Sequence, residues 1–407
     1  MMALQILANR GIFLEENIMK ESKIVGAAMR ILWLAIFIVS LGTFTTIANA
    51  QDAEIKIGVL TALTGTLGHM GETDLIGMQI ALDEINQGGG IQGKKIKLIV
   101  EDNEGNPAKA VTGATKLIQK DNVLAIIGCE VSFTTLAALQ VTTEAKIVQF
   151  SQGATADLMT SGPGLNKYPY FFRMGLGDKY TTKKLIDYGR KHYSKSAVLS
   201  DSGPAGQSFK GALEKHFTAA NLVPVLTETH TIGSPDKTPE LLKIRATGAD
   251  AIIIQAMPGD AISVLRGMNQ IGYKAQILGH LGFGETGTLG AAKELSEGVI
   301  TLVSHDLSKK SALGFVEKYK KRTGVTMEAW GRPMQGYDSV MILAEALRRA
   351  KLDKTKLKEA IESIKGYKPV SGTTKNVVNF GPKDHDGNQD EGPVLVKIVK
   401  GNWVTIE

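Results

Sequence analysis

Short apolar runs alternate with stretches of helical periodicity from residue 55 almost to the end of the chain. The runs are nearly continuous, which is typical of strands buried on both faces. This pattern predicts an α/β fold in which parallel sheets carry helices on both faces. The expected strands are 55–60, 96–101, 123–128, 147–150, 196–200, 223–229, 251–255, 276–279 and 299–303. The expected helices are 74–86, 107–121, 133–145, 181–193, 209–220, 239–246, 261–271, 311–323, 335–350 and 354–363.

The C-terminal part departs from this alternation. Residues 370–380 and 394–406 are each predicted to form a strand, and a polar turn at 381–392 separates them. A chain of this length is too long for one compact core, so the pattern favours two lobes.

The first 50 residues have the three parts of an export signal. Lys20, Lys23 and Arg30 form a basic region, residues 31–41 form an apolar core, and residues 48–50 (Ala-Asn-Ala) form a cleavage site. We therefore interpret residues 1–50 as a signal peptide and expect a periplasmic protein.

The mature chain is expected to start at Gln51. Met19 is a better translation start than Met1, since it directly opens the basic region. A membrane anchor is the alternative, because residues 31–50 carry no charge, but polar residues dilute the second half of that stretch.

Charge and cysteine content narrow the function classes. The net charge of +6 is spread along the chain without a basic block, so nucleic acid is not an expected partner. Cys129 is the only cysteine, and an intrachain disulfide is therefore impossible.

The motifs of common enzymes and metal sites are missing from the sequence. Gly65, Gly68 and Gly71 form neither a dinucleotide fingerprint nor a phosphate-binding loop. No nucleophile elbow or zinc spacing occurs, and we expect no catalytic residue, cofactor or metal. Asp384 and Asp386 resemble a calcium loop only in part, and a polar turn explains them better.

Four stretches resemble the leucine/isoleucine/valine-binding family of periplasmic solute-binding proteins. They are residues 55–86, residues 88–111, residues 125–139 followed by 151–160, and residues 248–273. The second, with its GGI-G-KI-L-D---P--A skeleton, is the most specific. The similarity extends over essentially the whole mature chain.

This resemblance implies two Rossmann-like lobes joined by a three-stranded hinge. Lobe one would comprise residues 52–172 and 302–376, and lobe two residues 173–301 and 377–407. The crossings are expected near 172–174, 299–302 and 377–380.

The resemblance also implies a function. The protein would be the binding component of an ABC importer: a monomer that closes on a ligand and delivers it to a membrane permease with a separate ATPase. A sensory receptor on the same fold and an exported enzyme are the alternatives. The missing output domain and the missing nucleophile weigh against them.

One half of the family's amino-acid site is present. Ser132 follows the expected strand 123–128 at the start of a helix, where the family has a carboxylate-binding serine. Gly153, Ala154 and Thr155 match the loop whose backbone and threonine hydroxyl also bind the carboxylate. Considered without the family, Ser132 and Thr155 could simply be helix caps.

The other half of the site differs. Leu281 stands where the amino-acid binders have a glutamate that pairs with the ligand ammonium. Met257, Ala205 and Met70 stand at positions of cleft aromatics. Glu285, Asp260 or Asp201 could instead supply the acid that pairs with a ligand ammonium.

We therefore expect a small carboxylate ligand, which is either an apolar amino acid or an organic acid such as an aromatic acid. An unpaired buried ammonium would be costly, and methionine walls suit a less polar ligand. His69 and His280 could bind the ligand or face solvent in loops. Trp330 and the pair Tyr337 and Asp338 are expected to have packing or structural roles.

Overall fold

The computed structural model describes residues 54–160, 162–327 and 331–406, together with Met19, Lys20 and Met29. The chain divides into two compact units, Met1–Ala53 and Glu54–Glu407. Except for those three residues, the predicted signal peptide lies outside the described part of the chain.

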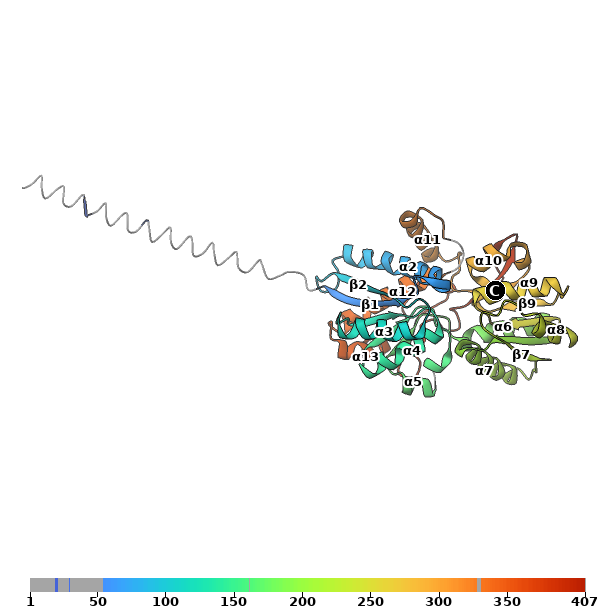
Figure 1. Ribbon diagram of the computed structural model, residues 1–407. Helices are drawn as coiled ribbons and strands as arrows, with labels where there is room; N and C mark the ends of the chain where they lie inside the picture. Colours follow the sequence, from blue (N-terminus) through green and yellow to red (C-terminus); the bar gives the residue numbers. More distant parts are fainter. Residues whose placement is uncertain (1–18, 21–28, 30–53, 161, 328–330, 407) are drawn as a thin grey trace, which may run out of the picture. The chain divides into compact units, whose positions relative to one another are not determined.

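Lobe one is built on a five-stranded parallel sheet with the order β2-β1-β3-β4-β5 (Figure 1). Its strands are β1 (Ile55–Thr61), β2 (Ile96–Asp102), β3 (Ala125–Gly128), β4 (Val148–Ser151) and β5 (Phe171–Arg173). Its helices are α2 (Gly68–Gln87), α3 (Pro107–Gln119), α4 (Ser132–Glu144), α5 (Pro163–Lys167), α11 (Lys310–Thr323), α12 (Arg332–Arg349) and α13 (Leu357–Glu362).

The alternation of side chains along β1 explains why helices cover both faces of this sheet. Ile57 and Val59 pack into the core shared with α2, α11, α12 and α13. Leu60 points to the opposite face, where it packs with residues of α3 and α4. All of these side chains are buried, as the nearly continuous apolar runs predicted.

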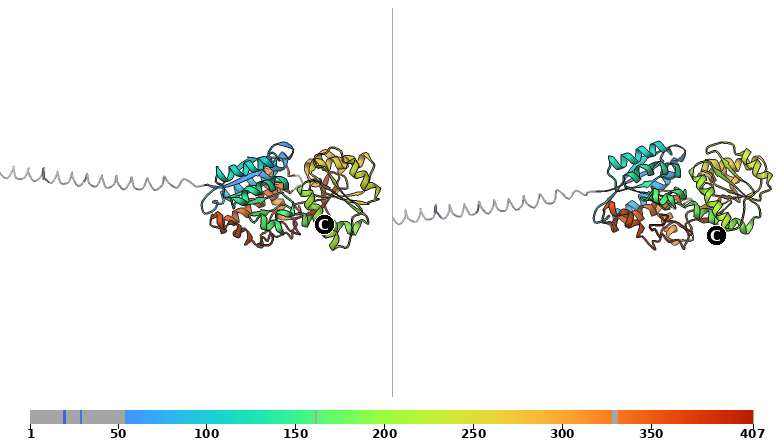
Figure 2. Two further views of the ribbon diagram at one scale, coloured as in Figure 1. Left: turned by 60° about the horizontal axis from the view of Figure 1, so that its bottom comes forward. Right: turned by 90° about the horizontal axis from the view of Figure 1, so that it is seen from below.

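Lobe two is built on a seven-stranded sheet with the order β12-β11-β10-β9-β8-β6-β7. Its strands are β6 (Ser196–Asp201), β7 (Thr227–His230), β8 (Ala251–Ile254), β9 (Gln276–Gly279), β10 (Ile300–Val303), β11 (Val394–Val399) and β12 (Asn402–Thr405). Its helices are α6 (Asp178–His192), α7 (Pro204–Ala219), α8 (Thr238–Ala246), α9 (Pro258–Gln270) and α10 (Thr286–Ala292). Figure 2 shows helices on both faces of each sheet. The predicted fold class, two α/β lobes with parallel sheets, is confirmed.

The C-terminal prediction needs two corrections. Residues 394–406 form an antiparallel hairpin, β11 and β12, because Lys400 and Gly401 both have positive φ and turn the chain back. Residues 370–380 form no named strand. The N–H groups of Val370 and Ser371 donate to the Asp338 carboxylate at 2.8 and 2.9 Å. Isolated bridges, Gly372 to His305 and Val378 to Tyr367, join the stretch to other backbone in place of a ladder.

Three segments connect the lobes. The first follows β5, whose last residue, Arg173, pairs with β4 in the sheet of lobe one. The second follows β10, which pairs with β9 and β11 in the sheet of lobe two, so residues 302 and 303 belong there. The third follows Phe380, since Val378 and Phe380 pack into the core of lobe one. Residues 302 and 303 complete the sheet of lobe two, and Val378 and Phe380 complete the core of lobe one, before the chain crosses to the other lobe.

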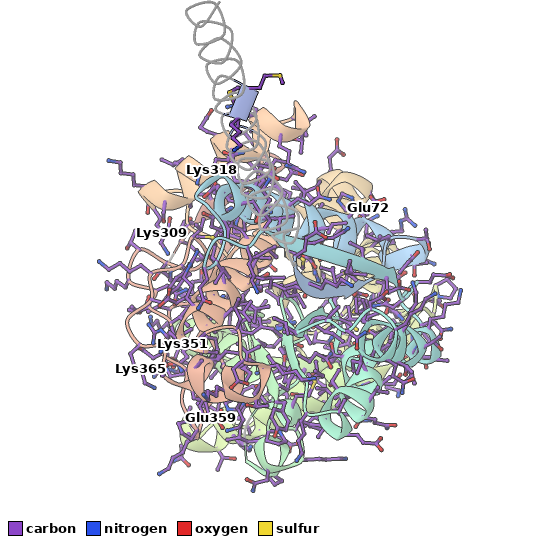
Figure 3. The ribbon with its side chains drawn as sticks, turned by 90° about the vertical axis from the view of Figure 1, so that its left-hand side faces the viewer. Glu72, Lys309, Lys318, Lys351, Glu359 and Lys365 are labelled. Atoms are coloured by element: carbon purple, nitrogen blue, oxygen red, sulfur yellow. The ribbon has the colours of Figure 1, made fainter. Side chains whose placement is uncertain are left out.

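Charge on the exterior is mixed. Figure 3 shows Glu72 and Glu359 on the same side of the molecule as Lys318, Lys351 and Lys365, and all five are exposed. Within the described residues, no helix combines the length and the apolar character needed to cross a bilayer.

Candidate functional site

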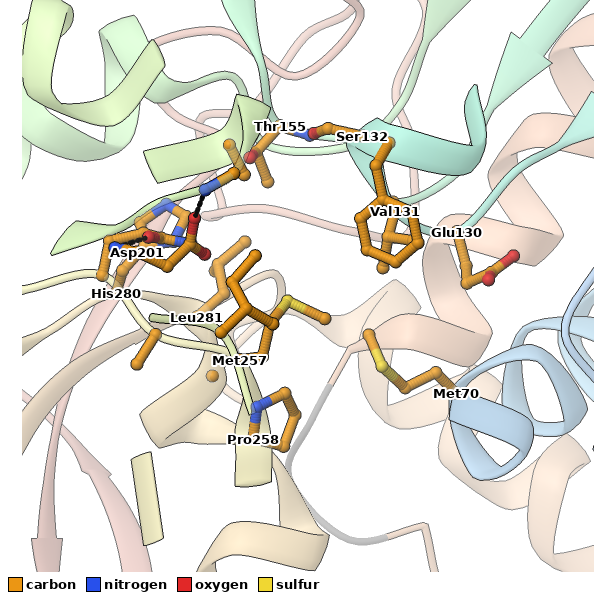
Figure 4. Close-up of a pocket in the computed structure, with 18 of the residues that line it drawn as sticks. Met70, Glu130, Val131, Ser132, Thr155, Asp201, Met257, Pro258, His280 and Leu281 are labelled. Carbon is orange, nitrogen blue, oxygen red and sulfur yellow. Dashed lines mark hydrogen bonds between the residues drawn. The ribbon is translucent and has the colours of Figure 1, made fainter. Parts of the chain in front are cut away.

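A pocket lies between the two lobes, at the carboxyl ends of their parallel strands (Figure 4). This is where open α/β sheets bind ligands. Seven of the eight predicted ligand residues line it: Met70, Ser132, Gly153, Thr155, Ala205, Met257 and Leu281. The eighth, Ala154, is fully buried and does not line the pocket.

Ser132 is the first residue of α4, and the N-cap is Val131, whose side chain makes no capping bond. Ser132 is therefore not an N-cap. Its Oγ accepts hydrogen bonds from the N–H groups of Thr155 and Ala156, each at 3.2 Å. A hydroxyl has one proton to donate and two acceptor positions. The acceptor positions are filled, and no described residue accepts the Ser132 proton.

The loop from Gly153 to Ala156 is held by serine side chains. The N–H groups of Gly153 and Ala154 donate to Ser151 Oγ at 3.3 and 2.9 Å, and Ser151 Oγ donates to the Cys129 carbonyl at 2.7 Å. The backbone amides of this loop, which the resemblance assigns to ligand binding, thus bond to protein hydroxyls in this structure. The donors at this end of the pocket are the hydroxyls of Ser132 and Thr155, two residues that line it, and the first N–H groups of α4.

Arg173 supports the same loop from behind. Its Nη1 donates to the carbonyls of Ala156 and Ala154 at 3.0 and 3.4 Å. Its other nitrogens bind the carboxylates of Asp157 and Asp386. The last β-strand residue of lobe one therefore fixes the loop that faces the pocket.

The remaining wall is mainly apolar. Met70 from α2 and Met257 and Leu281 from lobe two line the pocket, as Figure 4 shows. Ile232, from the loop after β7, lies against Gly203, where an added Cβ would come within 2.7 Å of it. Methionine and branched side chains suit a ligand with an apolar body.

The three acids proposed to replace the family's glutamate have different surroundings. Asp260 forms a buried ion pair with Lys237 at 2.8 Å and lies outside the pocket lining. Asp201 lines the pocket, and its carboxylate accepts from the N–H groups of Gly203 and Gly206 and from Gln255. Glu285 lines the pocket and pairs with Arg332.

Arg332 is a pocket residue that the sequence did not reveal. It begins α12 in lobe one and is almost fully buried. Its Nη1 donates to Asp74 Oδ2 at 2.9 Å, and its Nε donates to Glu285 Oε1 of lobe two at 3.2 Å. Burial raises the pKa of Asp74 to about 6 and that of Glu285 to about 7, although Arg332 opposes both shifts.

The two candidate histidines differ in position. His280 is buried and lines the pocket, its Nε2 lies 3.1 Å from Thr181 Oγ1, and burial lowers its pKa to about 3. It is therefore neutral at physiological pH. His69 is exposed and does not line the pocket.

Other residues singled out in the sequence have structural partners. Tyr337 donates to Glu84 at 2.8 Å, and Asp338 holds residues 370 and 371. Asp384 and Asp386 pair with Lys179 at 3.0 and 2.9 Å. No group of metal-ligating side chains occurs among the described residues. Trp330 lies outside them.

Comparison with known proteins identifies the family. A family model described as "periplasmic binding protein" matches residues 54–400. The chain therefore belongs to the periplasmic binding protein family, as its resemblance predicted.

Individual relatives agree with this assignment. The chain is 29% identical over 360 residues to Leu/Ile/Val-binding protein homolog 7 of Brucella melitensis, covering 84% of this chain and 88% of the relative. A branched-chain amino acid transporter substrate-binding protein, LivJ of Streptococcus pneumoniae in complex with isoleucine, has a TM-score of 0.74 at 23% identity, covering 87% and 100%. A Rhodopseudomonas palustris solute-binding protein in complex with 3,4-dihydroxybenzoic acid has a TM-score of 0.72 at 21% identity, covering 87% and 96%. These two structures share the fold.

Proposed function

We propose that this protein is the extracytoplasmic solute-binding component of an ABC importer and captures a small carboxylate between its lobes. The signal-like N-terminus and the family support export and delivery to a membrane permease. The same family supports a binding role without turnover. The residues that hold the carboxylate are Ser132 and Thr155, with the start of α4.

The Ser132 hydroxyl is the observation that carries this proposal. Both of its acceptor positions are occupied by N–H groups, so it can only donate to a ligand. A helix N-terminus next to it favours negative charge. An anionic oxygen is therefore the chemical group that fits this end of the pocket.

The body of the ligand is expected to be apolar and compact. Met70, Met257 and Leu281 supply the wall, and no dedicated glutamate stands at position 281. Two fold relatives bind isoleucine and 3,4-dihydroxybenzoic acid respectively, so both an apolar amino acid and an aromatic acid are represented on this fold.

Calorimetric titration with matched pairs of ligands tests the proposal. Leucine, phenylalanine and benzoate are each compared with the corresponding amide, which has the same shape without the carboxylate. At least one acid should bind, and its amide should bind at least about tenfold more weakly, since a hydrogen bond to a charged group is worth roughly 1.5–3 kcal/mol.

Variants locate the carboxylate. Ser132→Ala should weaken binding of the acid by about 10- to 100-fold. Ser263→Ala is the control, because that hydroxyl bonds only to the carbonyl of Gly259 in its own helix. Equal binding of acid and amide, or full affinity in Ser132→Ala, would contradict the proposal.

A further inference from the structure

Arg332 and Glu285 bring the two lobes into contact at the pocket wall. Arg332 opens α12 of lobe one, whereas Glu285 lies in lobe two between Phe283 and α10. Their side chains are only 6% and 5% exposed, and both line the pocket. An ion pair that crosses a ligand cleft is in a position to act on the ligand as well as on the protein.

One oxygen of the Glu285 carboxylate accepts no hydrogen bond from the described residues. Its Oε1 accepts from Arg332 Nε at 3.2 Å, and this is the hydrogen bond that its carboxylate makes within the described residues. Its second oxygen, Oε2, accepts none there. A carboxylate in a nearly dry environment is strongly destabilised unless its oxygens receive donors. Because Glu285 lines the pocket, a ligand in the pocket can bring a hydrogen-bond donor to Oε2.

The surroundings of Arg332 contain more acceptors than donors. Asp74 Oδ2 receives Arg332 Nη1 and Gln152 Nε2, but Asp74 Oδ1 has no partner among the described residues. Glu130, whose charge also interacts with Arg332, has one oxygen, Oε1, that is buried without a partner among the described residues. Two carboxyl oxygens near Arg332 are thus buried without a hydrogen-bond partner among the described residues.

This cluster lies close to the carboxylate end of the pocket. A Cβ added to Gly153 would be 3.0 Å from Arg332 Nη1, so the guanidinium packs against the loop that carries Thr155. A group near Glu285 can therefore belong to the same small ligand whose carboxylate binds Ser132.

We propose that Glu285 is a ligand-binding residue that accepts a hydrogen bond from a donor group on the ligand. Arg332, held by Asp74, orients the Glu285 carboxylate. The pocket thereby selects small carboxylates that carry a hydroxyl or ammonium group over those that lack one. This inference rests on the proposed carboxylate-binding function and specifies its substrate class.

The expected preference for donor-bearing acids follows from Glu285 Oε2, which accepts no hydrogen bond from the described residues. A site built to hydrogen-bond a ligand group rejects the analogue without it, because the analogue leaves a buried polar atom unsatisfied. Leu281, the nearest counterpart of the family's glutamate, cannot supply an acceptor. The selectivity should therefore depend on Glu285.

Two matched ligand sets test the proposal by calorimetry. The first is leucine, 2-hydroxy-4-methylpentanoate and 4-methylpentanoate, which differ only in an ammonium, a hydroxyl or neither. The second is 4-aminobenzoate, 4-hydroxybenzoate and benzoate. In at least one set, a donor-bearing acid should bind about tenfold or more tightly than the acid without a donor.

Variants assign that preference to Glu285. Glu285→Met removes the acceptor, and the preference should disappear. Glu285→Gln keeps a neutral acceptor. It should still bind the hydroxyl acids more tightly than the donor-free acids, but it should no longer prefer the ammonium-bearing acid. Glu228→Gln is the control, because Glu228 pairs with Lys243 away from the pocket. Thermal melting confirms that each variant is folded. If Glu285→Met does not fold, the ammonium preference in Glu285→Gln decides, and its persistence would contradict the proposal.

The outcomes separate this inference from the proposed function. If carboxylates bind but the donor-bearing and donor-free acids bind equally, the role of Glu285 is wrong and the carboxylate site stands. If the preference persists in Glu285→Met, the role of Glu285 is also wrong. If no carboxylate binds at all, the proposed function itself has failed.

Discussion

Two buried arginines, Arg173 at the lobe connection and Arg332 at the pocket, each bind two carboxylates, but their environments differ. Around Arg173, burial alone would raise the pKa of Asp386, yet Arg173 and Lys179 together lower it to about 2. Around Arg332, burial prevails, and the pKa values of Asp74 and Glu285 rise to about 6 and 7.

The number of cations and donors explains this difference. Asp386 has two cationic partners. Asp157, the second carboxylate bound to Arg173, lies closer to the behaviour of the Arg332 cluster, since burial raises its pKa. Asp74 and Glu285 share one guanidinium. A compensated cluster of this kind stabilises a fold, whereas an under-compensated cluster next to a cavity has capacity for a ligand donor.

Removing Arg173 should have the largest effect. Arg173→Met would leave Asp386 and Asp157 buried beside an apolar side chain, which costs about 3–5 kcal/mol of unfolding free energy. Urea denaturation measures the loss. Arg190→Met, which removes an exposed ion pair with Asp187, is the control. Wild-type stability in Arg173→Met would show that the connection does not depend on this cluster.

The pH dependence of stability tests the second cluster. The pKa of Glu285 is higher in the folded protein than its usual 4.5, so the folded state binds the proton more tightly. Its contribution to stability is therefore largest at low pH and falls as pH rises from about 4.5 to 7. Relative to Glu285→Gln, the wild type should lose about 1–3 kcal/mol over this range.

Urea denaturation of both proteins at pH 5 and pH 7.5 measures this change. The difference between them isolates Glu285, because the other titrating groups are common to both. A difference that is independent of pH would mean that Glu285 ionises normally and that Arg332 fully compensates it.

A glutamate at position 281 should change ligand preference more modestly. Leu281→Glu restores the acid that the amino-acid binders have, and it gives a ligand ammonium a new partner. Because the added carboxylate must itself be desolvated, we expect about a tenfold gain for leucine relative to 4-methylpentanoate. Calorimetry gives the ratio. An unchanged ratio would place position 281 away from the ligand's ammonium.

An exposed charge pair should matter least. Lys183 and Asp187 form a surface pair one turn apart on α6. Asp187→Asn should change the unfolding free energy by less than about 0.5 kcal/mol, since exposed pairs are screened by water. A larger loss, measured by urea denaturation, would show that surface charges here act as a network.

Sequence reasoning located most of the strands, although not β5, because their physical signature is local. A strand buried on both faces must be apolar along its length, and β1, β3, β8 and β9 all follow this rule. The stretch 370–380 contains three valines and a phenylalanine for another reason. It packs Val378 and Phe380 into the core of lobe one while its backbone bonds to Asp338, and apolar content alone does not separate these cases.

Sequence reasoning named Glu285 but not Arg332 or Asp74, because the members of this cluster are far apart in the chain. Asp74 and Glu285 lie 258 and 47 residues from Arg332. One local signal was available: a cation at the first position of a helix is unfavourable next to the helix dipole. An arginine in that position implies a nearby acid, although it does not identify the acid.

The most direct test of the account is a crystal structure with the tightest carboxylate found by calorimetry. A ligand carboxylate oxygen should accept a hydrogen bond from Ser132 Oγ, with the body of the ligand against Met70 and Met257. A ligand bound with its carboxylate directed away from Ser132 and Thr155 would contradict the central claim.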